Sequence, residues 1–240
     1  MFVLPSDSLD FQFPPVDLAS PEGLLAIGGD LRTERLLAAY RAGVFPWYNS
    51  GQPILWWSPD PRAILFLDKL KISRSLAKTL RKKKFRIRLD TRFREVIQAC
   101  SGERSNQQTP GTWIHPEMIE AYCELHAKGY AHSVESWLDD NLVGGLYGVS
   151  LGGGFFGESM FSNTSDASKV ALVYLVRQLQ RWDFDFIDAQ VSSEHLTRLG
   201  AEDIRRSRFM DILQQSLGKQ TRQGTWELDP DLDVAASAQD

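Results

Sequence analysis

The hydrophobic positions of the chain change period along its length, and these changes predict a fold of mixed helices and strands. Near the N-terminus, Leu36, Leu37 and Tyr40 form one apolar helical face, which Thr33 caps and Gly43 ends. Beyond residue 62, helical and strand periods alternate. The predicted helices span 73–83, 91–100, 116–128, 166–182, 195–199 and 207–217. The predicted strands span 85–89, 131–138, 142–149, 154–161 and 184–191.

Three consecutive strands, 131–138, 142–149 and 154–161, are separated only by short turns and therefore predict an antiparallel meander. Together with the helices, they indicate an α+β fold. The first sixty or so residues are rich in Pro, Gly and Trp, so we expect a small N-terminal α+β domain, 1–62, before a larger domain, 63–226. Residues 227–240 hold five acids and no base and predict a disordered acidic tail.

The composition is that of a soluble globular protein. Of 240 residues, 42% are hydrophobic and 24% charged, which excludes a fibre, a disordered protein or a membrane-spanning one. The first 15 residues lack the pattern of a signal peptide, so we expect a cytoplasmic protein with no membrane partner. Two cysteines without a CxxC pattern and four scattered histidines imply neither a disulfide framework nor a metal site.

The net charge of −4 conceals a strongly basic segment. Residues 69–94 hold twelve Lys or Arg and one acid, a net +11, which leaves 15 basic and 30 acidic residues, a net −15, elsewhere. A solvated charged face is one explanation, but this imbalance favours a polyanion such as RNA. Phe85, Ile87 and Leu89 are expected to point inward. The candidate phosphate-binding residues are Arg74, Arg81, Lys82, Lys83, Lys84, Arg86 and Arg88.

Glycines recur from Gly144 to Gly154, but the run matches neither GxGxxG opening a helix nor a P-loop. Because both flanks are predicted strands, turns and close backbone approaches explain these glycines better than a phosphate loop does. We therefore expect no bound cofactor.

Two acids lie within apolar strands, where an unpaired carboxylate is costly to bury. Glu158 lies in the segment 155–161, and Asp188 lies in the segment 184–191. The strand period places Asp188 and Gln190 on one face. Each acid could be a satisfied structural carboxylate, but the occurrence of two favours a shared site.

Large aromatic side chains concentrate near the predicted domain junction, among them Trp47, Trp56, Trp57 and Trp113. Core packing is the ordinary explanation for them. The alternative is a wall on which an unpaired RNA base stacks.

At these same residues the sequence resembles the leucyl/phenylalanyl-tRNA–protein transferase family. The resemblance covers about residues 23–201, and its specific blocks are WWSPDPR, 56–62, and GESMFS, 157–162. The remaining blocks are GLLAIGGDL (23–31), FPWYNSGQPIL (45–55), GTWI (111–114), GGLYGV (144–149), NTSDASK (163–169) and DAQVSSEHLTRLGA (188–201).

The resemblance implies that the larger domain is similar to the acyl-CoA N-acyltransferase (GNAT) superfamily, with a largely antiparallel sheet. It implies an aminoacyltransferase that uses no acetyl-CoA. The implied donors are leucyl-, phenylalanyl- and, more weakly, methionyl-tRNA, and the acceptors are proteins with N-terminal Arg or Lys, marked for the N-degron pathway. We expect a monomer.

The resemblance also assigns residues. Asp188 and Gln190 match the pair tied to activation of the amine, and Glu158 matches an acid near the reacting end. Trp47 and Trp113 match aromatic positions near the aminoacyl-adenosine. The residues expected around the aminoacyl side chain are Leu146, Phe155, Leu175, Leu179 and Ile187.

Three positions depart from the expected pattern: Ala189 replaces a frequent Cys, Leu146 an expected Met, and Ser193 an expected Asn. The first affects packing, the second reshapes the pocket modestly, and Ser193 is given no role.

Our hypothesis for the mechanism is that Asp188 polarises or orients Gln190, whose amide oxygen accepts a hydrogen bond from the attacking amine. Glu158 attracts the cationic acceptor or holds the terminal ribose. The alternatives are a tRNA-dependent transferase with a different amine acceptor and a non-catalytic tRNA-binding module.

Overall fold

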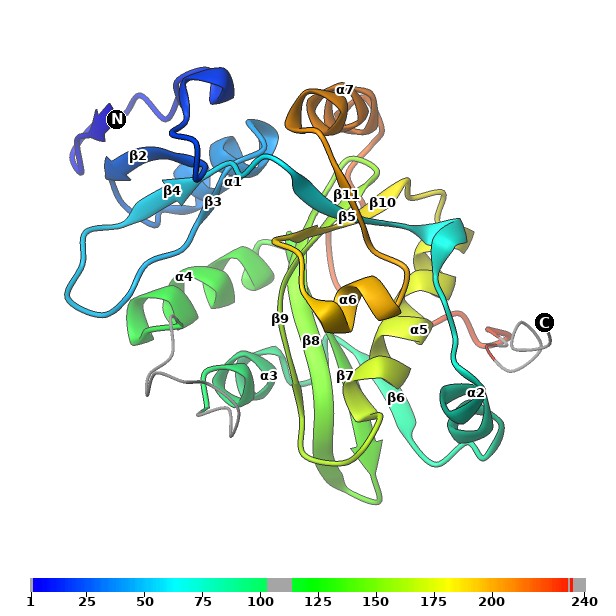
Figure 1. The fold of residues 1–240 in the computed structure, drawn as a ribbon. Coiled ribbons are helices and arrows are strands. Elements are labelled where there is room, and N and C mark those ends of the chain that lie inside the picture. Colours follow the sequence, from blue (N-terminus) through cyan, green and yellow to red (C-terminus); the bar gives the residue numbers. More distant parts are fainter. Residues whose placement is uncertain (1, 103–113, 233, 235–240) are drawn as a thin grey trace.

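The computed structural model describes residues 2–102, 114–232 and 234, and within them the chain forms two sheets (Figure 1). The small N-terminal sheet contains β1 (Phe2–Leu4), β2 (Leu24–Gly28), β3 (Phe45–Pro46) and β4 (Leu55–Trp57), in the order β1-β2-β4-β3. It carries the 3₁₀ turn η1 (Val16–Leu18) and helix α1 (Thr33–Arg41). The chain then passes to the large sheet between Trp57 and Arg62.

The large sheet has the strand order β11-β5-β10-β9-β8-β7-β6. All neighbouring strands are antiparallel except β9 and β10, which are parallel. The predicted meander is confirmed as β7, β8 and β9. The strands are β5 (Arg62–Phe66), β6 (Arg86–Leu89), β7 (Ala131–Leu138), β8 (Asn141–Leu151), β9 (Gly154–Ser162), β10 (Phe186–Gln190) and β11 (Glu202–Ile204).

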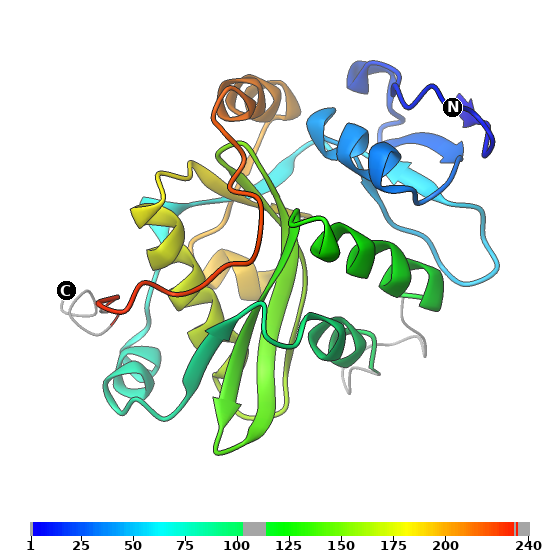
Figure 2. The same ribbon diagram turned by 180° about the vertical axis from the view of Figure 1, so that it is seen from behind.

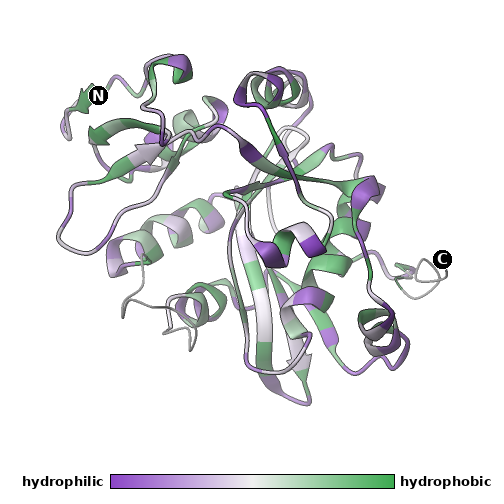
Figure 3. Ribbon diagram, viewed as in Figure 1, coloured by the Kyte–Doolittle hydropathy of each residue, from purple (hydrophilic) through white to green (hydrophobic). Residues whose placement is uncertain are grey.

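Helices cover both faces of the large sheet, as the two opposite views show (Figures 1 and 2). One face packs against α3 (Phe93–Cys100), α4 (Pro116–Ala127) and α7 (Arg206–Leu217), and its core continues into α1 and the small sheet. The other face packs against η2 (Leu67–Lys69), α2 (Arg74–Arg81), α5 (Ala167–Arg181) and α6 (Glu194–Arg198). The central strands are mostly white to green by hydropathy, and the outer connections are mostly purple (Figure 3). The predicted α+β class is therefore confirmed.

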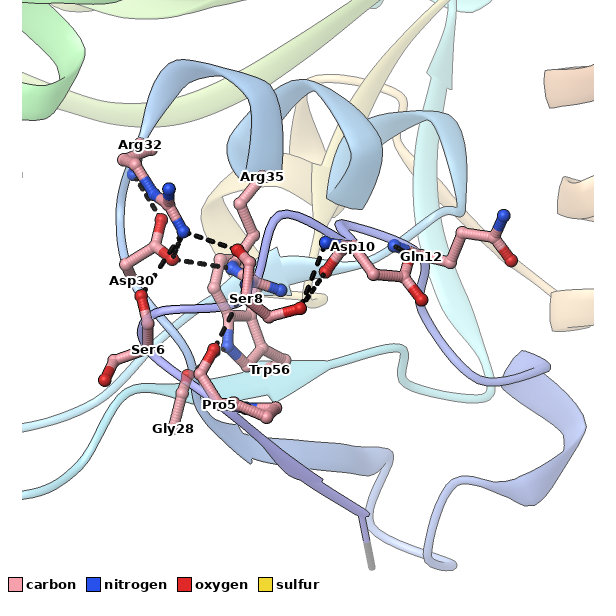
Figure 4. Close-up of polar contacts among 10 residues, drawn as sticks. All are labelled: Pro5, Ser6, Ser8, Asp10, Gln12, Gly28, Asp30, Arg32, Arg35 and Trp56. Carbon is pink, nitrogen blue, oxygen red and sulfur yellow. Dashed lines mark hydrogen bonds and ion pairs between the residues drawn. The ribbon is translucent and has the colours of Figure 1, made fainter.

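Polar contacts fix the N-terminal segment onto α1 (Figure 4). Asp30 accepts hydrogen bonds from the guanidinium groups of Arg32 at 2.8 Å and of Arg35 at 3.1 Å. Arg35, which is fully buried, also donates to the carbonyl oxygen of Pro5 at 3.2 Å. The bond to Pro5, together with one from Arg32 to the carbonyl oxygen of Ser8 at 2.7 Å, ties this segment to α1.

Close backbone approaches explain Gly148, within β8, and Gly152, in the turn between β8 and β9, as predicted. A Cβ atom at Gly148 would lie 2.3 Å from the carbonyl oxygen of Phe156. Gly152 has a φ of +55° in the turn between the two strands, where a Cβ would lie 2.2 Å from the carbonyl oxygen of Ser216. Both positions exclude any side chain.

Several sequence predictions differ from the structure. Thr33 does not cap α1; it is the first helical residue, and its hydroxyl donates to Glu124 at 3.1 Å. The strands of the small sheet, β5 and β11 were not predicted, because each is short and lacks a clear alternation.

The C-terminal segment, expected to be disordered, has defined contacts over residues 226–232. The backbone N–H of Asp229 donates to Gln178 at 2.8 Å, and Arg181 forms an ion pair with Asp231 at 2.6 Å. Leu228 and Leu232 pack against the core beside α5. For this part of the segment the expectation of disorder is therefore wrong.

Candidate active site

An apolar pocket of about 430 Å³ lies between α5, α6 and the large sheet. Helix α5, ten of whose residues are buried, contributes Leu172 and Leu175 to one wall. Residues of β5, β8, β9 and β10, with Glu158 among them, form the rest of the lining. The lining is mainly aliphatic and aromatic, which suits an apolar side chain of a ligand.

The structure brings four of the five predicted side-chain-binding residues together. Leu146, Phe155, Leu175 and Ile187 line the pocket, whereas Leu179 lies fully buried on α5, outside the described lining. Lining residues that the sequence did not indicate include Leu65, Tyr147, Met160, Leu172, His195 and Leu196.

The two predicted tryptophans do not contribute to this lining. Trp47 lies just after β3, 43% exposed, with its ring centroid 6.0 Å from that of Trp57. Trp113 lies outside the described residues.

The parallel register of β9 and β10 brings Glu158 and Gln190 together. Asp188 lies opposite Phe156, so two residues further along Gln190 reaches Glu158, and its amide Nε2 donates to Glu158 Oε1 at 2.7 Å. Gln190 has a φ of +64°, a left-handed conformation that is uncommon for residues other than glycine. Such backbone strain concentrates at functional sites.

The Asp188 carboxylate bonds to the backbone of Gln190 and not to its side chain. The structure differs here from the regular strand alternation, because the register shifts between these two residues. Asp188 is fully buried, and its Oδ1 accepts the backbone N–H of Gln190 at 2.8 Å. Arg62 binds the same carboxylate through Nε at 2.9 Å and Nη2 at 2.7 Å. Asp188 therefore fixes the backbone of Gln190 rather than polarising its amide.

Arg62 is itself 1% exposed and is held from several sides. Its guanidinium lies between the rings of Phe45 and Phe209, 4.8 and 4.7 Å from their centroids, and donates to the carbonyl oxygen of Gly43 at 3.2 Å. A buried carboxylate with a bidentate arginine partner is a rigid anchor.

Glu158 lies at the centre of a buried polar cluster. The hydroxyl of Tyr40, from α1, is 2.8 Å from Glu158 Oε1, and that of Tyr122, from α4, is 3.0 Å from Oε2. Burial raises the pKa of Glu158 from 4.5 to about 7, against the opposing effect of its hydrogen bonds. Burial and the neighbouring Glu158 raise the pKa of both tyrosines well above 10.

Sequence reasoning missed Arg62, Tyr40 and Tyr122, although Arg62 ends the WWSPDPR block. It gave no role to Ser193, which caps α6: its hydroxyl accepts the backbone N–H of Leu196 at 3.3 Å. His195 follows on α6 at the pocket, and burial lowers its pKa.

All seven predicted phosphate-binding residues are exposed, along α2, β6 and the turn between them. Arg86 forms a solvent-exposed ion pair with Asp140 at 3.4 Å, and Arg88 lies over the ring of Trp137. As predicted, Phe85 and Leu89 point inward, and Ile87 is partly buried. The segment therefore presents its charge to solvent.

Within the described ranges, His, Cys, Asp and Glu side chains form no group of three suited to a metal ion. No helix of this part of the chain has both the length and the apolar character of a membrane span.

An α+β fold with an apolar pocket whose lining includes the buried carboxyl group of Glu158 defines a protein suited to hold an apolar group beside polar side chains. Comparison with family models identifies the family within this class. Residues 64–214 match the model described as leucyl/phenylalanyl-tRNA protein transferase, and residues 29–60 match the N-terminal domain of the same family. The chain belongs to the leucyl/phenylalanyl-tRNA–protein transferase family of aminoacyltransferases.

Curated relatives agree over nearly the whole chain. The leucyl/phenylalanyl-tRNA–protein transferase of Anaeromyxobacter sp. is 54% identical over 92% of this chain and 93% of its own length. That of Nitrosomonas europaea is 57% identical over 86% of this chain and 87% of its own length.

Two solved structures overlap only loosely with this fold. L-PGS from Bacillus licheniformis has a TM-score of 0.40 at 12% identity, over 71% of this chain and 54% of that one. A GCN5-related N-acetyltransferase-like protein from Streptococcus suis has a TM-score of 0.31 at 15% identity, over 60% and 57%. At these TM-scores the overlaps do not indicate a function.

Proposed function

We propose that this protein transfers Leu or Phe, and Met more weakly, from aminoacyl-tRNA to the α-amino group of proteins that begin with Arg or Lys. In this proposal it acts as a cytoplasmic monomer, and its products enter the N-degron pathway. The observation that carries the proposal is the apolar pocket, whose lining includes Glu158, the hydrogen-bond partner of Gln190. An aminoacyl side chain in that pocket would present its ester to the polar cluster.

The reaction is aminolysis of an ester: a bond forms between the amine nitrogen and the acyl carbon, and the bond to the ribose oxygen breaks. The nitrogen loses one proton, and the leaving ribose oxygen gains one to become a hydroxyl group. A free α-amino group has a pKa of about 7.7–8.0, so only a small lowering of that pKa is needed for the amine to be largely neutral near pH 7. Gln190 is no strong base, and its contribution is positioning. Because Gln190 Nε2 donates to Glu158, the amide oxygen is the atom that accepts a hydrogen bond from the amine.

Asp188 acts on this step through the main chain. Its carboxylate holds the backbone N–H of Gln190 in the left-handed conformation, and Arg62 holds the carboxylate. We therefore expect Asp188→Ala and Gln190→Ala to slow transfer while tRNA binding persists. Unimpaired transfer by both variants would contradict the assignment.

Selection of Leu and Phe follows from the pocket chemistry. Burying an apolar side chain there is favourable, whereas a polar one loses its hydration without a partner. One methylene changes discrimination by only about 1–3 kcal/mol, so Met is expected to be a weaker donor rather than an excluded one. The basic surface from Arg74 to Arg88 would contact the tRNA backbone.

The decisive experiment measures transfer of labelled Leu from charged tRNA to peptides that differ only in their first residue. Transfer to peptides beginning with Arg or Lys, and not to a peptide beginning with Ala, supports the proposal. Efficient transfer to a small-molecule amine alone would indicate a different acceptor. Tight tRNA binding without any transfer would indicate a non-catalytic tRNA-binding module.

A further inference from the structure

Glu158, which lines the pocket, forms a closed ring of oxygen contacts with two tyrosines. The hydroxyl oxygens of Tyr40 and Tyr122 are 2.5 Å apart. Tyr40 lies 2.8 Å from Glu158 Oε1, and Tyr122 lies 3.0 Å from Glu158 Oε2. Gln190 Nε2, at 2.7 Å, adds a fourth contact to Oε1.

Each of these contacts needs one hydrogen. Gln190 supplies the hydrogen for its own contact, and each tyrosine hydroxyl supplies one more. The three contacts of the ring therefore have only two hydrogens unless the carboxyl group supplies the third. Two hydroxyl oxygens at 2.5 Å without a hydrogen between them would repel each other.

We infer that Glu158 is protonated in the resting protein and that this neutral acid is a positioning residue for Gln190. Oε1 already accepts from Gln190, so the proton lies on Oε2. The hydrogen bonds then run in one direction: Glu158 Oε2–H donates to Tyr122, Tyr122 donates to Tyr40, and Tyr40 donates to Oε1.

The surroundings favour this neutral form. Glu158 is 8% exposed, and the charge nearest to it on β10 is the carboxylate of Asp188, which disfavours a second negative charge. Arg62, from β5, is engaged with Asp188 rather than with Glu158. The other titratable groups here are phenols: Tyr40 from α1 and Tyr122 from α4, which belong to the ring, and Tyr147 from β8, which packs against Tyr122. Burial raises the pKa of Tyr40 and Tyr122 and so keeps both protonated.

A neutral Glu158 has a chemical consequence that rests on the proposed function. The neutral acid accepts a hydrogen bond from the Gln190 amide without placing a negative charge beside the attacking amine. An ionised Glu158 would stabilise the ammonium form, raise the pKa of the amine and leave less nucleophile. This differs from the first of the two roles expected from the sequence, in which Glu158 attracts the cationic acceptor rather than holding the terminal ribose.

A second buried glutamate provides a matched control with the opposite hydrogen count. Glu135 is fully buried and accepts hydrogen bonds from the backbone N–H groups of Thr91 and Arg92 and from three side chains. Those side chains are Thr91, Ser133 and Trp137. All five partners donate, so Glu135 needs no proton of its own.

The test is infrared spectroscopy of the folded protein, with Glu158→Gln and Glu135→Gln as reference variants. At pH 6 we expect a carboxylic-acid carbonyl band that Glu158→Gln removes and Glu135→Gln retains. The band should disappear as the pH rises above about 7. If Glu158→Gln removed no such band at pH 6, the inference would be overturned, whatever reaction the protein catalyses.

The kinetic arm compares Glu158→Ala with Glu158→Gln. Loss of the positioned hydrogen bonds in Glu158→Ala is expected to lower kcat/KM about tenfold, and the neutral amide of Glu158→Gln should recover most of that loss. The ratio of Glu158→Gln to wild-type activity should rise between pH 6 and pH 8. A folded Glu158→Gln protein as slow as Glu158→Ala would show that the negative charge is required. Absence of transfer by the wild type would refute the proposed function and leave the infrared result to decide the proton.

Discussion

The buried pair of Arg62 and Asp188 allows a quantitative prediction about stability. Both side chains are at most 1% exposed and share two hydrogen bonds of 2.7 and 2.9 Å. Arg62→Met fills similar volume but leaves Asp188 buried without its cation. Removing one partner of such a pair costs about 3–5 kcal/mol. We therefore expect Arg62→Met to lose that much unfolding free energy.

The assay is urea denaturation followed by tryptophan fluorescence. With a slope of about 3 kcal/mol/M, the expected loss lowers the midpoint by about 1–1.7 M. Arg94→Met is the matched control, because Arg94 pairs with Glu120 at 2.6 Å but both side chains are largely exposed. Screening by solvent makes that pair weak, so the urea midpoint of Arg94→Met should stay close to that of the wild type.

A double variant separates stability from activity. Arg62→Met combined with Asp188→Leu replaces the pair with apolar groups, which is often neutral or stabilising, so the midpoint should recover. Transfer should not recover, because the backbone N–H of Gln190 has lost its acceptor. A loss below about 1 kcal/mol for Arg62→Met alone would refute this reasoning about the buried charge.

Three further predictions concern other parts of the molecule. The pKa of Glu158 is raised from 4.5 to about 7, so the wild type should lose about 3 kcal/mol of unfolding free energy as the pH rises from 4.5 to 7. Urea unfolding at several pH values measures this loss, and Glu158→Gln should not show it. Changing Lys82, Lys83 and Lys84 to Glu should weaken tRNA binding and flatten its dependence on salt, as filter binding at several ionic strengths would show. Trp226→Ala, which removes a side chain that is 1% exposed, should lower the unfolding free energy by about 3–5 kcal/mol in thermal or urea melts.

The sequence carried enough information to predict the elements with strong periodicity. The meander, α4 with Pro116 at its start and α5 are in the expected places, because local patterns determine them. The acids Glu158 and Asp188 were also recognisable, since a charge inside an apolar strand has few explanations.

The partners of those acids were not predictable from local patterns. Tyr40 and Glu158 are 118 positions apart, and Arg62 and Asp188 are 126 apart, so only the tertiary fold brings them together. The left-handed backbone of Gln190 also breaks the strand alternation from which Asp188 and Gln190 were placed on one face. The register of β9 and β10 would have indicated the contact between Glu158 and Gln190.

The origin of Tyr40 in the small domain has an evolutionary consequence. The ring around Glu158 draws one hydroxyl from α1, and the same apolar core continues from Leu25 and Trp56 into α3 and α4. The larger domain expressed alone would therefore expose part of its core and leave Glu158 without one of its hydroxyl neighbours. Recombination that exchanged the small domain would have to preserve the position of Tyr40. The two domains are thus expected to be inherited as a single unit.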